Sequence, residues 1–385
     1  MSKSLHVKRA IALFLLSTML ANPVGSIALA GGDSGFVSTS HAEKQLDASE
    51  LVSPFSHNYG PDTVSGDLMR MQAYYGDRMS VGIYGQSTEG RDLFCITMGD
   101  GQKTIVLTAA IHAREFVTSK IAMDLANDLL QKAQNGDEAG QYLLDNFTVV
   151  ILPMLNPDGV NLVQNGYDSV SEELRKVCED ALKPRSKFGK TVKENVVGID
   201  LNRDFIQQEA VETQALVQFL TATNEIRPIV TVVDIHTSGG WVIKKGSASV
   251  KLARDVSDAL GKNYPTLDQR KDDKNWLTGF VREKMKIPSV LVEVARKVHT
   301  AQKLEGRYAS NSPIDNNEWL RVNAYDKVWK DLQNLWDGIY KYVVTHVKEI
   351  SKEPESIRQA LGRSRMKGEF SGSASPKKGG TDIII

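Results

Sequence analysis

Polar side chains stand at the ends of apolar runs that are typical of buried strands. The run "TIVLTAAI" is followed at once by His112, with Glu115 three residues later, and "PIVTVVDI" is followed by His236. The run "PSVLVEVA" carries Glu293 near its end. In open α/β sheets, ligands bind beyond the carboxyl ends of the strands, so these ends are expected to meet at one rim. The four side chains therefore predict a functional site.

Two histidines and one carboxylate suit a catalytic zinc site, because three protein ligands leave one position open for water. His112 and Glu115 are close enough along the chain to reach one ion, and His236 completes the set. Zinc lowers the pKa of its water and polarises a carbonyl. Glu293 is then a spare carboxylate, suited to move a proton from the water to a leaving nitrogen. A lone H-x-x-E pattern is weak evidence, so the prediction rests on the coincidence of all four residues with strand ends.

Helical segments alternate with the apolar runs that must position these residues. In residues 62–75 apolar side chains recur every three or four positions, which predicts a helix. Two short apolar runs around "TEGR" predict a hairpin. The remaining predicted strands are 104–111, 147–155, 228–235 and 288–295, and the remaining predicted helices are 118–133, 211–224, 249–264, 276–285 and 324–350.

The central strands are continuously apolar rather than alternating, so both of their faces are expected to be buried. Helices must then cover the two faces of a largely parallel sheet. We predict an α/β fold with a mixed, largely parallel central β-sheet sandwiched by helices.

Five short motifs carry a resemblance to a known family. In order, they are "IHAREF", "LNPDGV", "GIDLNRDF", "DIHTSGG" and "VLVEV", and "STEGRDL" precedes them. Together they resemble the zinc carboxypeptidases, the carboxypeptidase A-like metallopeptidases, over roughly residues 62–345. The resemblance implies one zinc ion held by His112, Glu115 and His236, with Glu293 as general acid and base. The family fold, a mixed sheet between helices, agrees with the fold predicted from the strands.

Asn202 and Arg203, in "DLNRDF", resemble the pair that grips a substrate carboxylate in this family. The chemistry fits, because the planar guanidinium of arginine offers a fork of donors that matches a carboxylate. The family also uses a second, upstream arginine to stabilise the oxyanion. Arg185 in "KPRSKF" is one candidate for that position. Lys193 is the other, because "VKENVVGIDLNRDF" resembles a run found in cell-wall members of the family.

Several features bear on the substrate. Family carboxypeptidases carry a tyrosine in a loop after a D-W-like pair, whereas the comparable stretch here, "DDKNWLTGF", has none, and Tyr264 lies upstream. The segment that begins with "LNPDG" resembles bacterial peptidases that cut the γ-D-glutamyl–diaminopimelate bond of peptidoglycan stem peptides. Lys244 and Lys245 follow the His236 strand and are either cations that meet an acidic substrate or ordinary solvated lysines.

Composition and the N-terminus indicate where the protein works. Lys plus Arg equals Asp plus Glu at 47 each, which argues against a general nucleic-acid binder. A basic stretch, an apolar run and "ALA" predict a signal peptide at 1–30, with cleavage near Ala30 and no stable membrane insertion afterwards. A secreted or periplasmic location follows. Cys95 and Cys178 are too few for a disulfide framework, and we expect two unpaired thiols.

The chain is predicted to have four segments. These are the signal peptide at 1–30, a flexible lead-in at 31–60, the catalytic domain at 61–348 and a disordered tail at 349–385. The predicted protein is an exported, monomeric zinc metallopeptidase that acts on a peptide or a peptidoglycan stem peptide. The alternatives are an ordinary C-terminal metallocarboxypeptidase, a catalytically silent binding module and an amidohydrolase acting on acylated amino acids.

Overall fold

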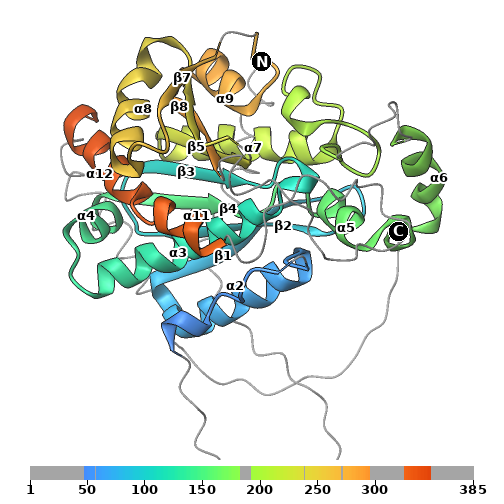
Figure 1. The fold of residues 1–385 in the computed structure, drawn as a ribbon, viewed down its shortest axis with the longest axis horizontal. Helices are drawn as coiled ribbons and strands as arrows, with labels where there is room; N and C mark the ends of the chain where they lie inside the picture. Colours follow the sequence, from blue (N-terminus) through green and yellow to red (C-terminus); the bar gives the residue numbers. More distant parts are fainter. Residues whose placement is uncertain are drawn as a thin grey trace, which may run out of the picture. The chain divides into compact units, whose positions relative to one another are not determined.

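The computed structural model describes residues 47–56, 58–182, 192–237, 239–269, 272–294 and 325–347. All of these residues belong to one compact unit, which ends at Val347. An eight-stranded sheet forms its centre, and helices cover both faces of the sheet (Figure 1). Within the described ranges, no helix combines the length and the apolar character that crossing a membrane would require.

The sheet has a parallel centre and antiparallel flanks. In spatial order its strands are β1 (Met79–Gln86), β2 (Asp92–Met98), β4 (Phe147–Leu152), β3 (Lys103–Ala109), β5 (Ile229–Thr237), β8 (Ser289–Val294), β6 (Trp241–Lys244) and β7 (Thr266–Asp268). Strands β4, β3, β5 and β8 run parallel to one another, so their carboxyl ends meet at one edge. The pairs β1–β2, β2–β4 and β6–β8 are antiparallel, and β7 is parallel to β6.

Helices pack against both faces of this sheet and enclose two apolar cores. The first core receives side chains from α2 (Pro61–Tyr75), α3 (Val117–Gln134), α4 (Glu138–Asn146), α5 (Pro157–Asn165), α6 (Glu172–Ala181), α8 (Gly246–Leu260), α11 (Tyr325–Leu332) and α12 (Leu335–His346). The second core receives side chains from α7 (Val211–Ile226), α9 (Leu277–Phe280) and the π-helical turn Val281–Met285. The predicted mixed sheet between helices is confirmed.

Successive side chains of a central strand enter opposite cores. Ile105 and Leu107 of β3 belong to the first core and Val106 to the second, and all three are fully buried. This double burial is why the strand is apolar at every position rather than at every second one. Cys95 belongs to the second core and Cys178 to the first, and both are free thiols, as predicted.

The predicted closing helix at 324–350 is wrong in one respect, because the structure divides it into α11 and α12. A turn at Gln333 and Asn334 separates the two helices. The Lys132 ammonium donates a hydrogen bond to the carbonyl of Gln333, with a distance of 2.8 Å. Asn334 occupies the position before α12 with non-helical backbone and makes no side-chain hydrogen bond that caps the helix. Apolar periodicity continues across this turn, so it does not reveal the break.

The prediction of a flexible lead-in at 31–60 is wrong for its last residues. Leu51 and Tyr59 are fully buried in the first core. The Tyr59 hydroxyl donates to one oxygen of Asp67 at 2.6 Å, and the Ser53 hydroxyl donates to the other at 2.7 Å. These contacts fasten the segment to α2. The predicted signal peptide and the predicted tail lie outside the described residues.

Candidate active site and metal centre

His112 and Glu115 follow the carboxyl end of β3. Directly after the strand, Ala110 adopts a left-handed backbone with a φ of 50°, a conformation that a residue with a side chain rarely takes. Its N–H donates to the Thr118 hydroxyl at 2.8 Å, which holds this turn. His112 stays extended, and the 3-10 helix Ala113–Glu115 then brings the Glu115 carboxylate back toward the His112 ring.

His236 and Glu293 come from two neighbouring strands, β5 and β8. The parallel register pairs His236 directly with Glu293. On the other side of β8, the antiparallel register pairs Glu293 with Trp241 of β6. Residues paired across neighbouring strands project to the same face of a sheet. The register therefore sets His236, Glu293 and Trp241 in one row on one face.

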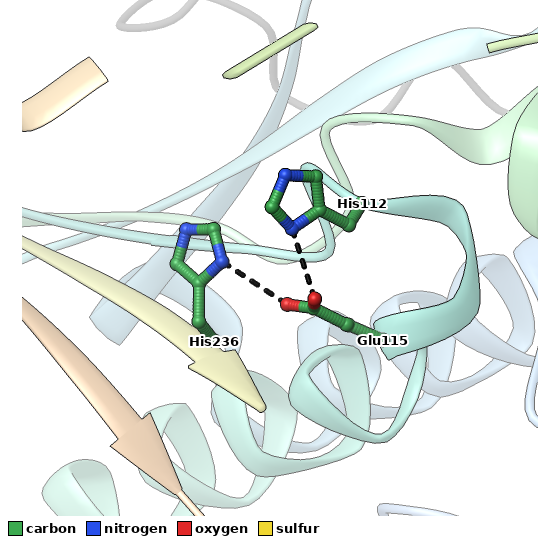
Figure 2. Close-up of side chains that lie close together, drawn as sticks. All are labelled: His112, Glu115 and His236. Atoms are coloured by element: carbon green, nitrogen blue, oxygen red, sulfur yellow. Dashed lines mark hydrogen bonds and ion pairs between the residues drawn. The ribbon is translucent and has the colours of Figure 1, made fainter. Parts of the chain in front are cut away.

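The side chains of His112, Glu115 and His236 converge (Figure 2). Nδ1 of His112 lies 2.9 Å from one Glu115 oxygen, and Nδ1 of His236 lies 3.0 Å from the other. The three ligand atoms all lie within 4.8 Å of one another. Zinc bonds of about 2.0–2.2 Å to histidine nitrogen and carboxylate oxygen require ligand atoms roughly 3–4 Å apart. The cluster therefore fits a metal ion with two nitrogen ligands and one oxygen ligand.

An aspartate contacts the far nitrogen of each histidine ring. Nε2 of His236 lies 2.8 Å from Asp234, whose other oxygen accepts a hydrogen bond from the Thr108 hydroxyl at 2.7 Å. Nε2 of His112 lies 3.3 Å from Asp200. Such carboxylates orient metal-binding rings and leave Nδ1 as the free ligand atom. Neither aspartate is among the predicted site residues, although the D-x-H of "DIH" and the aspartate of "GIDLN" are visible in the sequence.

The two glutamates of the site differ in their surroundings: Glu115 is buried and Glu293 is half-buried. Burial alone would raise the pKa of Glu115, but its contacts with His112 and His236 hold that pKa well below the usual value. Burial raises the pKa of Glu293, and the nearby histidines offset this only in part. One Glu293 carboxylate oxygen is buried, and no described residue donates a hydrogen bond to it. Glu293 is therefore a stronger base than an exposed glutamate, and one of its oxygens receives no hydrogen bond from the described residues.

Asp200 connects Asn202 and Arg203 to the metal-binding cluster. The Asp200 oxygen that contacts the first histidine also accepts the N–H of Asn202 at 3.0 Å. The side-chain oxygen of Asn202 accepts the N–H of Leu277 at 2.9 Å, so its amide nitrogen keeps its donors. The exposed Arg203 donates to the Asn202 carbonyl at 2.6 Å. These contacts leave donors of both side chains unused, and the charge of Arg203 acts to lower the pKa of Asp200.

The structure bears differently on the two candidate oxyanion cations. Lys193 is half-buried, and its charge acts to lower the pKa of both Glu293 and Asp200, so it lies within electrostatic reach of the cluster. The Lys193 carbonyl accepts the N–H of Ala113 at 3.2 Å, which ties this segment to the loop after β3. Arg185 lies outside the described residues. Both candidates stay open.

The structure decides two points about substrate contacts that the sequence leaves open. Tyr264 is 1 % exposed and belongs to the first core, so it is not available to replace the missing loop tyrosine. Lys244 forms an ion pair with Asp268, and the Lys245 ammonium lies 2.9 Å from Asp273. Both lysines are engaged by carboxylates of the protein. The interpretation of these lysines as substrate-binding cations is therefore not supported.

Two of the sequence motifs, "LNPDGV" and "STEGRDL", contribute no residue to the metal-binding cluster but form hydrogen bonds that support the segments around it. Asp158 of "LNPDGV" accepts hydrogen bonds from the Ser87 hydroxyl at 2.8 Å and the Arg91 guanidinium at 2.7 Å, both in "STEGRDL". The Asn156 amide donates to the carbonyl of Ile111 at 3.3 Å, in the loop that carries the first histidine. These contacts hold the hairpin and the loop in place around the site.

Comparison with known sequences agrees with this geometry. A family described as zinc carboxypeptidase matches residues 66–311. The chain is 33 % identical over 153 residues to a γ-D-glutamyl-L-diamino acid endopeptidase of Lysinibacillus sphaericus, with 38 % of each chain covered. It is 29 % identical over 134 residues to carboxypeptidase E of Caenorhabditis elegans, covering 33 % of this chain and 25 % of the relative. An inactive metallocarboxypeptidase of Uncinocarpus reesii is 31 % identical over 123 residues, which cover 29 % of this chain and 21 % of that relative. The matched segments span well under half the length of these relatives.

Solved structures share the fold at low sequence identity. Thrombin activatable fibrinolysis inhibitor aligns with a TM-score of 0.55 and 14 % identity over 78 % of this chain and 79 % of its own. Carboxypeptidase A of Helicoverpa armigera aligns with a TM-score of 0.52 and 14 % identity over 89 % and 82 %. The match to the family description covers more than half of the sequence. The chain belongs to the zinc carboxypeptidase family.

Proposed function

We propose that this protein is an exported zinc metallopeptidase that hydrolyses an amide bond beside a substrate carboxylate in peptidoglycan stem peptides. The observation that carries the proposal is the convergence of His112, Glu115 and His236 beside Glu293. The Asn202–Arg203 pair, which Asp200 joins to this cluster, adds a means of substrate recognition.

His112, Glu115 and His236 are the residues that would hold the metal. A zinc ion at this position supplies Lewis acidity, lowering the pKa of water and polarising a carbonyl. Asp234 holds the His236 ring through Nε2 so that its Nδ1 faces the Glu115 carboxylate, and Asp200 lies 3.3 Å from Nε2 of His112. These outer contacts matter because small rotations of a ligand ring weaken metal binding.

Glu293 acts as general base and then as general acid. It takes a proton from the attacking water and passes it to the leaving nitrogen. Burial raises the pKa of Glu293, which makes its carboxylate a better proton acceptor than an exposed glutamate. Its buried oxygen has no hydrogen-bond donor among the described residues, so the proton-accepting position is not already occupied by protein.

Arg203 and Asn202 bind the substrate carboxylate through their N–H groups. Charge-assisted hydrogen bonds of this kind are stronger than neutral ones and fix the orientation of a planar acid. Lys193 or Arg185 stabilises negative charge on the scissile carbonyl oxygen. For Lys193 the support is its electrostatic influence on Glu293.

The substrate class is inferred from three considerations. A relative matched at 33 % identity is named as a γ-D-glutamyl-L-diamino acid endopeptidase. Family carboxypeptidases place a loop tyrosine over the C-terminal residue of the substrate. The stretch 272–280 has no tyrosine and Tyr264 is buried, so none of these positions supplies that tyrosine here. A stem peptide carries free acids close to its γ-D-glutamyl bond, and an exported enzyme would meet it.

The test compares two substrate classes with protein recovered from the exported fraction, whose N-terminus should lie after the predicted cleavage site near Ala30. Muropeptides with γ-D-glutamyl–diaminopimelate bonds and blocked or unblocked dipeptides are incubated with zinc-loaded protein, and products are identified by mass. We expect faster cleavage of the γ-D-glutamyl bond. Amidating the recognised carboxylate should slow cleavage roughly tenfold or more, since a charged hydrogen bond contributes about 1.5–3 kcal/mol.

Each other outcome selects a different function. Activity confined to simple C-terminal residues would leave an ordinary metallocarboxypeptidase. Equal rates on free-acid and amidated muropeptides would remove the carboxylate recognition assigned to Arg203. Binding without turnover would favour a silent module, a possibility that the inactive fungal relative keeps relevant. An unprocessed N-terminus in an intracellular fraction would overturn the proposed export.

A further inference from the structure

Arg203 lies over the indole of Trp276. The guanidinium carbon is 4.5 Å from the centroid of the indole ring, which is within the range of a cation–π contact. The two residues are far apart in sequence, and Trp276 comes directly before α9 (Figure 1). Arg203 is exposed and Trp276 is half-buried, so the indole forms a partly covered platform for a solvent-facing guanidinium.

Several hydrogen bonds join the segment around Arg203 to the segment around Trp276. The N–H of Leu277 donates to the Asn202 side chain at 2.9 Å. The N–H of Phe205 donates to the Asn275 carbonyl at 3.4 Å. A third contact runs from the N–H of Ile206 to the Asn275 side chain at 3.1 Å. The indole is therefore held in place by backbone contacts on both sides of the stack.

The stack and carboxylate binding use different parts of the guanidinium. A cation–π contact uses the flat face, whereas a carboxylate is bound through N–H groups at the edge. One of these groups donates to the Asn202 carbonyl at 2.6 Å, and the planar fork keeps further donors for a ligand. An exposed arginine without such a platform samples many rotamers and loses that freedom on binding. The indole restricts it in advance.

We propose that Trp276 is a positioning residue for substrate recognition, which holds the Arg203 guanidinium flat so that its edge faces the substrate carboxylate. The proposal rests on the carboxylate-binding function proposed for Arg203. It also assigns a use to the stretch "DDKNWLTGF", which lacks the loop tyrosine: its tryptophan acts on the arginine rather than on the substrate.

The test uses Trp276→Leu and Trp276→Phe, assayed with L-alanyl-γ-D-glutamyl-diaminopimelate whose glutamate carboxylate is free or amidated. For Trp276→Leu we expect KM for the free acid to rise about fivefold, the change that a partly exposed cation–π contact supports, with kcat within twofold of wild type. KM for the amide should not change. Trp276→Phe keeps an aromatic face and should lie between wild type and Trp276→Leu.

A matched control separates positioning from general destabilisation. Trp329→Leu removes a half-buried tryptophan of α11 and should leave the ratio of KM for amide to KM for free acid unchanged. Binding of the free-acid dipeptide product, measured by calorimetry, gives a second reading that does not depend on turnover. It should weaken by the same factor in Trp276→Leu.

The outcomes distinguish this inference from the proposed function beneath it. Arg203→Leu should abolish the preference for the free acid. If it does so and Trp276→Leu leaves that preference intact, Trp276 is not a positioning residue and Arg203 keeps its function. If Trp276→Leu lowers kcat for both substrates equally, its contribution is structural. If Arg203→Leu has no effect on the preference, both proposals are wrong.

Discussion

At the scale of single residues, the acid–base chemistry of the site follows from what surrounds each carboxyl. Burial raises the pKa of Glu293, which β8 places beside His236. Glu115 is more deeply buried, but its contacts with His112 and His236 hold its pKa well below the usual value. A carboxylate that stays ionised suits a metal ligand. A carboxyl whose pKa is raised suits a group that must take up and release a proton.

Glu293→Gln should remove turnover without removing the metal. Glutamine keeps the size and hydrogen-bonding capacity of the side chain but cannot accept the proton. We expect kcat to fall by at least the ~10²–10⁴-fold that general acid–base catalysis contributes, because one residue serves both proton transfers. Metal content is measured by atomic emission and should match wild type.

Glu283→Gln is the matched control, since Glu283 is a half-exposed glutamate on the π-helical turn. It should leave both kcat and metal content unchanged. Wild-type turnover in Glu293→Gln would move the base to another group. Loss of zinc in that variant would instead make Glu293 a contributor to metal binding.

At the scale of elements, the segment before α9 is held by a buried carboxylate. Asp273 is 2 % exposed and receives the Arg282 guanidinium at 2.8 Å and 3.0 Å and the Lys245 ammonium at 2.9 Å. Arg282 belongs to the π-helical turn, and Lys245 stands directly before α8. The carboxylate thus joins the segment that carries Trp276 to the π-helical turn and to the start of α8. Burial acts to raise its pKa, but the two cations hold the pKa below the usual value.

Asp273→Asn should destabilise the protein most at neutral pH. Because the folded-state pKa of Asp273 lies below the unfolded value, the ion pairs contribute fully above the unfolded pKa of about 3.9. Their contribution shrinks below that value and is lost as the pH falls through the lower, folded-state pKa. We expect the free energy of unfolding to drop by about 1.5–3 kcal/mol at pH 7, and this difference to shrink toward pH 3. Urea unfolding at several pH values measures it.

Asp272→Asn is the control for this substitution, because Asp272 is exposed and lies 3.9 Å from the Lys274 ammonium. It should change the free energy of unfolding by only a few tenths of a kcal/mol at any pH. A difference between Asp273→Asn and wild type that is constant from pH 7 to pH 3 would contradict the ion-pair explanation.

At the scale of the whole molecule, the residues of the metal-binding cluster are distant in sequence and meet only in the folded chain. His112 and Glu115 follow β3, and His236 lies one residue before the end of β5, the direct neighbour of β3 in the sheet. An ion held by all three adds a connection between these two strands. Because the unfolded chain does not hold the three ligands together, metal binding should favour the folded state.

Removing the metal should lower the thermal stability. With metal at about 1,000 times its dissociation constant, the folded state gains about 4 kcal/mol, so a chelator should lower Tm by several degrees and zinc should restore it. In His236→Ala the chelator should have almost no effect on Tm. Scanning calorimetry measures both.

His346→Ala, which changes a histidine of α12 near Asp255, should respond to the chelator as wild type does. An equal chelator effect in His236→Ala and wild type would mean that the stabilising ion binds elsewhere.

The secondary structure is predictable from the sequence where apolar periodicity is long and local. The central strands and the helices α2, α3 and α7 follow that periodicity. By contrast, α6 is mostly charged, and Cys178 is its one side chain described as buried. Strand β7 is three exposed residues, Thr266–Asp268. Such elements depend on their neighbours for stability, so their own residues do not predict them.

The sequence by itself determined the chemistry of the site, because residue types and short motifs at strand ends are local properties. It pointed to His112, Glu115 and His236 as one group and to Glu293 as the spare carboxylate. Tertiary structure decided how these side chains meet. The β5–β8 register sets His236 beside Glu293, and the fold brings an aspartate to the far nitrogen of each histidine ring.

The contact between Arg203 and Trp276 likewise exists only in the folded chain. The residues next to Arg203 in the sequence do not predict a contact with Trp276, and those next to Trp276 do not predict a contact with Arg203. Their approach depends on hydrogen bonds that join the two segments and on the packing of α9 against the sheet. Contacts between residues distant in sequence are set by packing and register, which local periodicity does not encode.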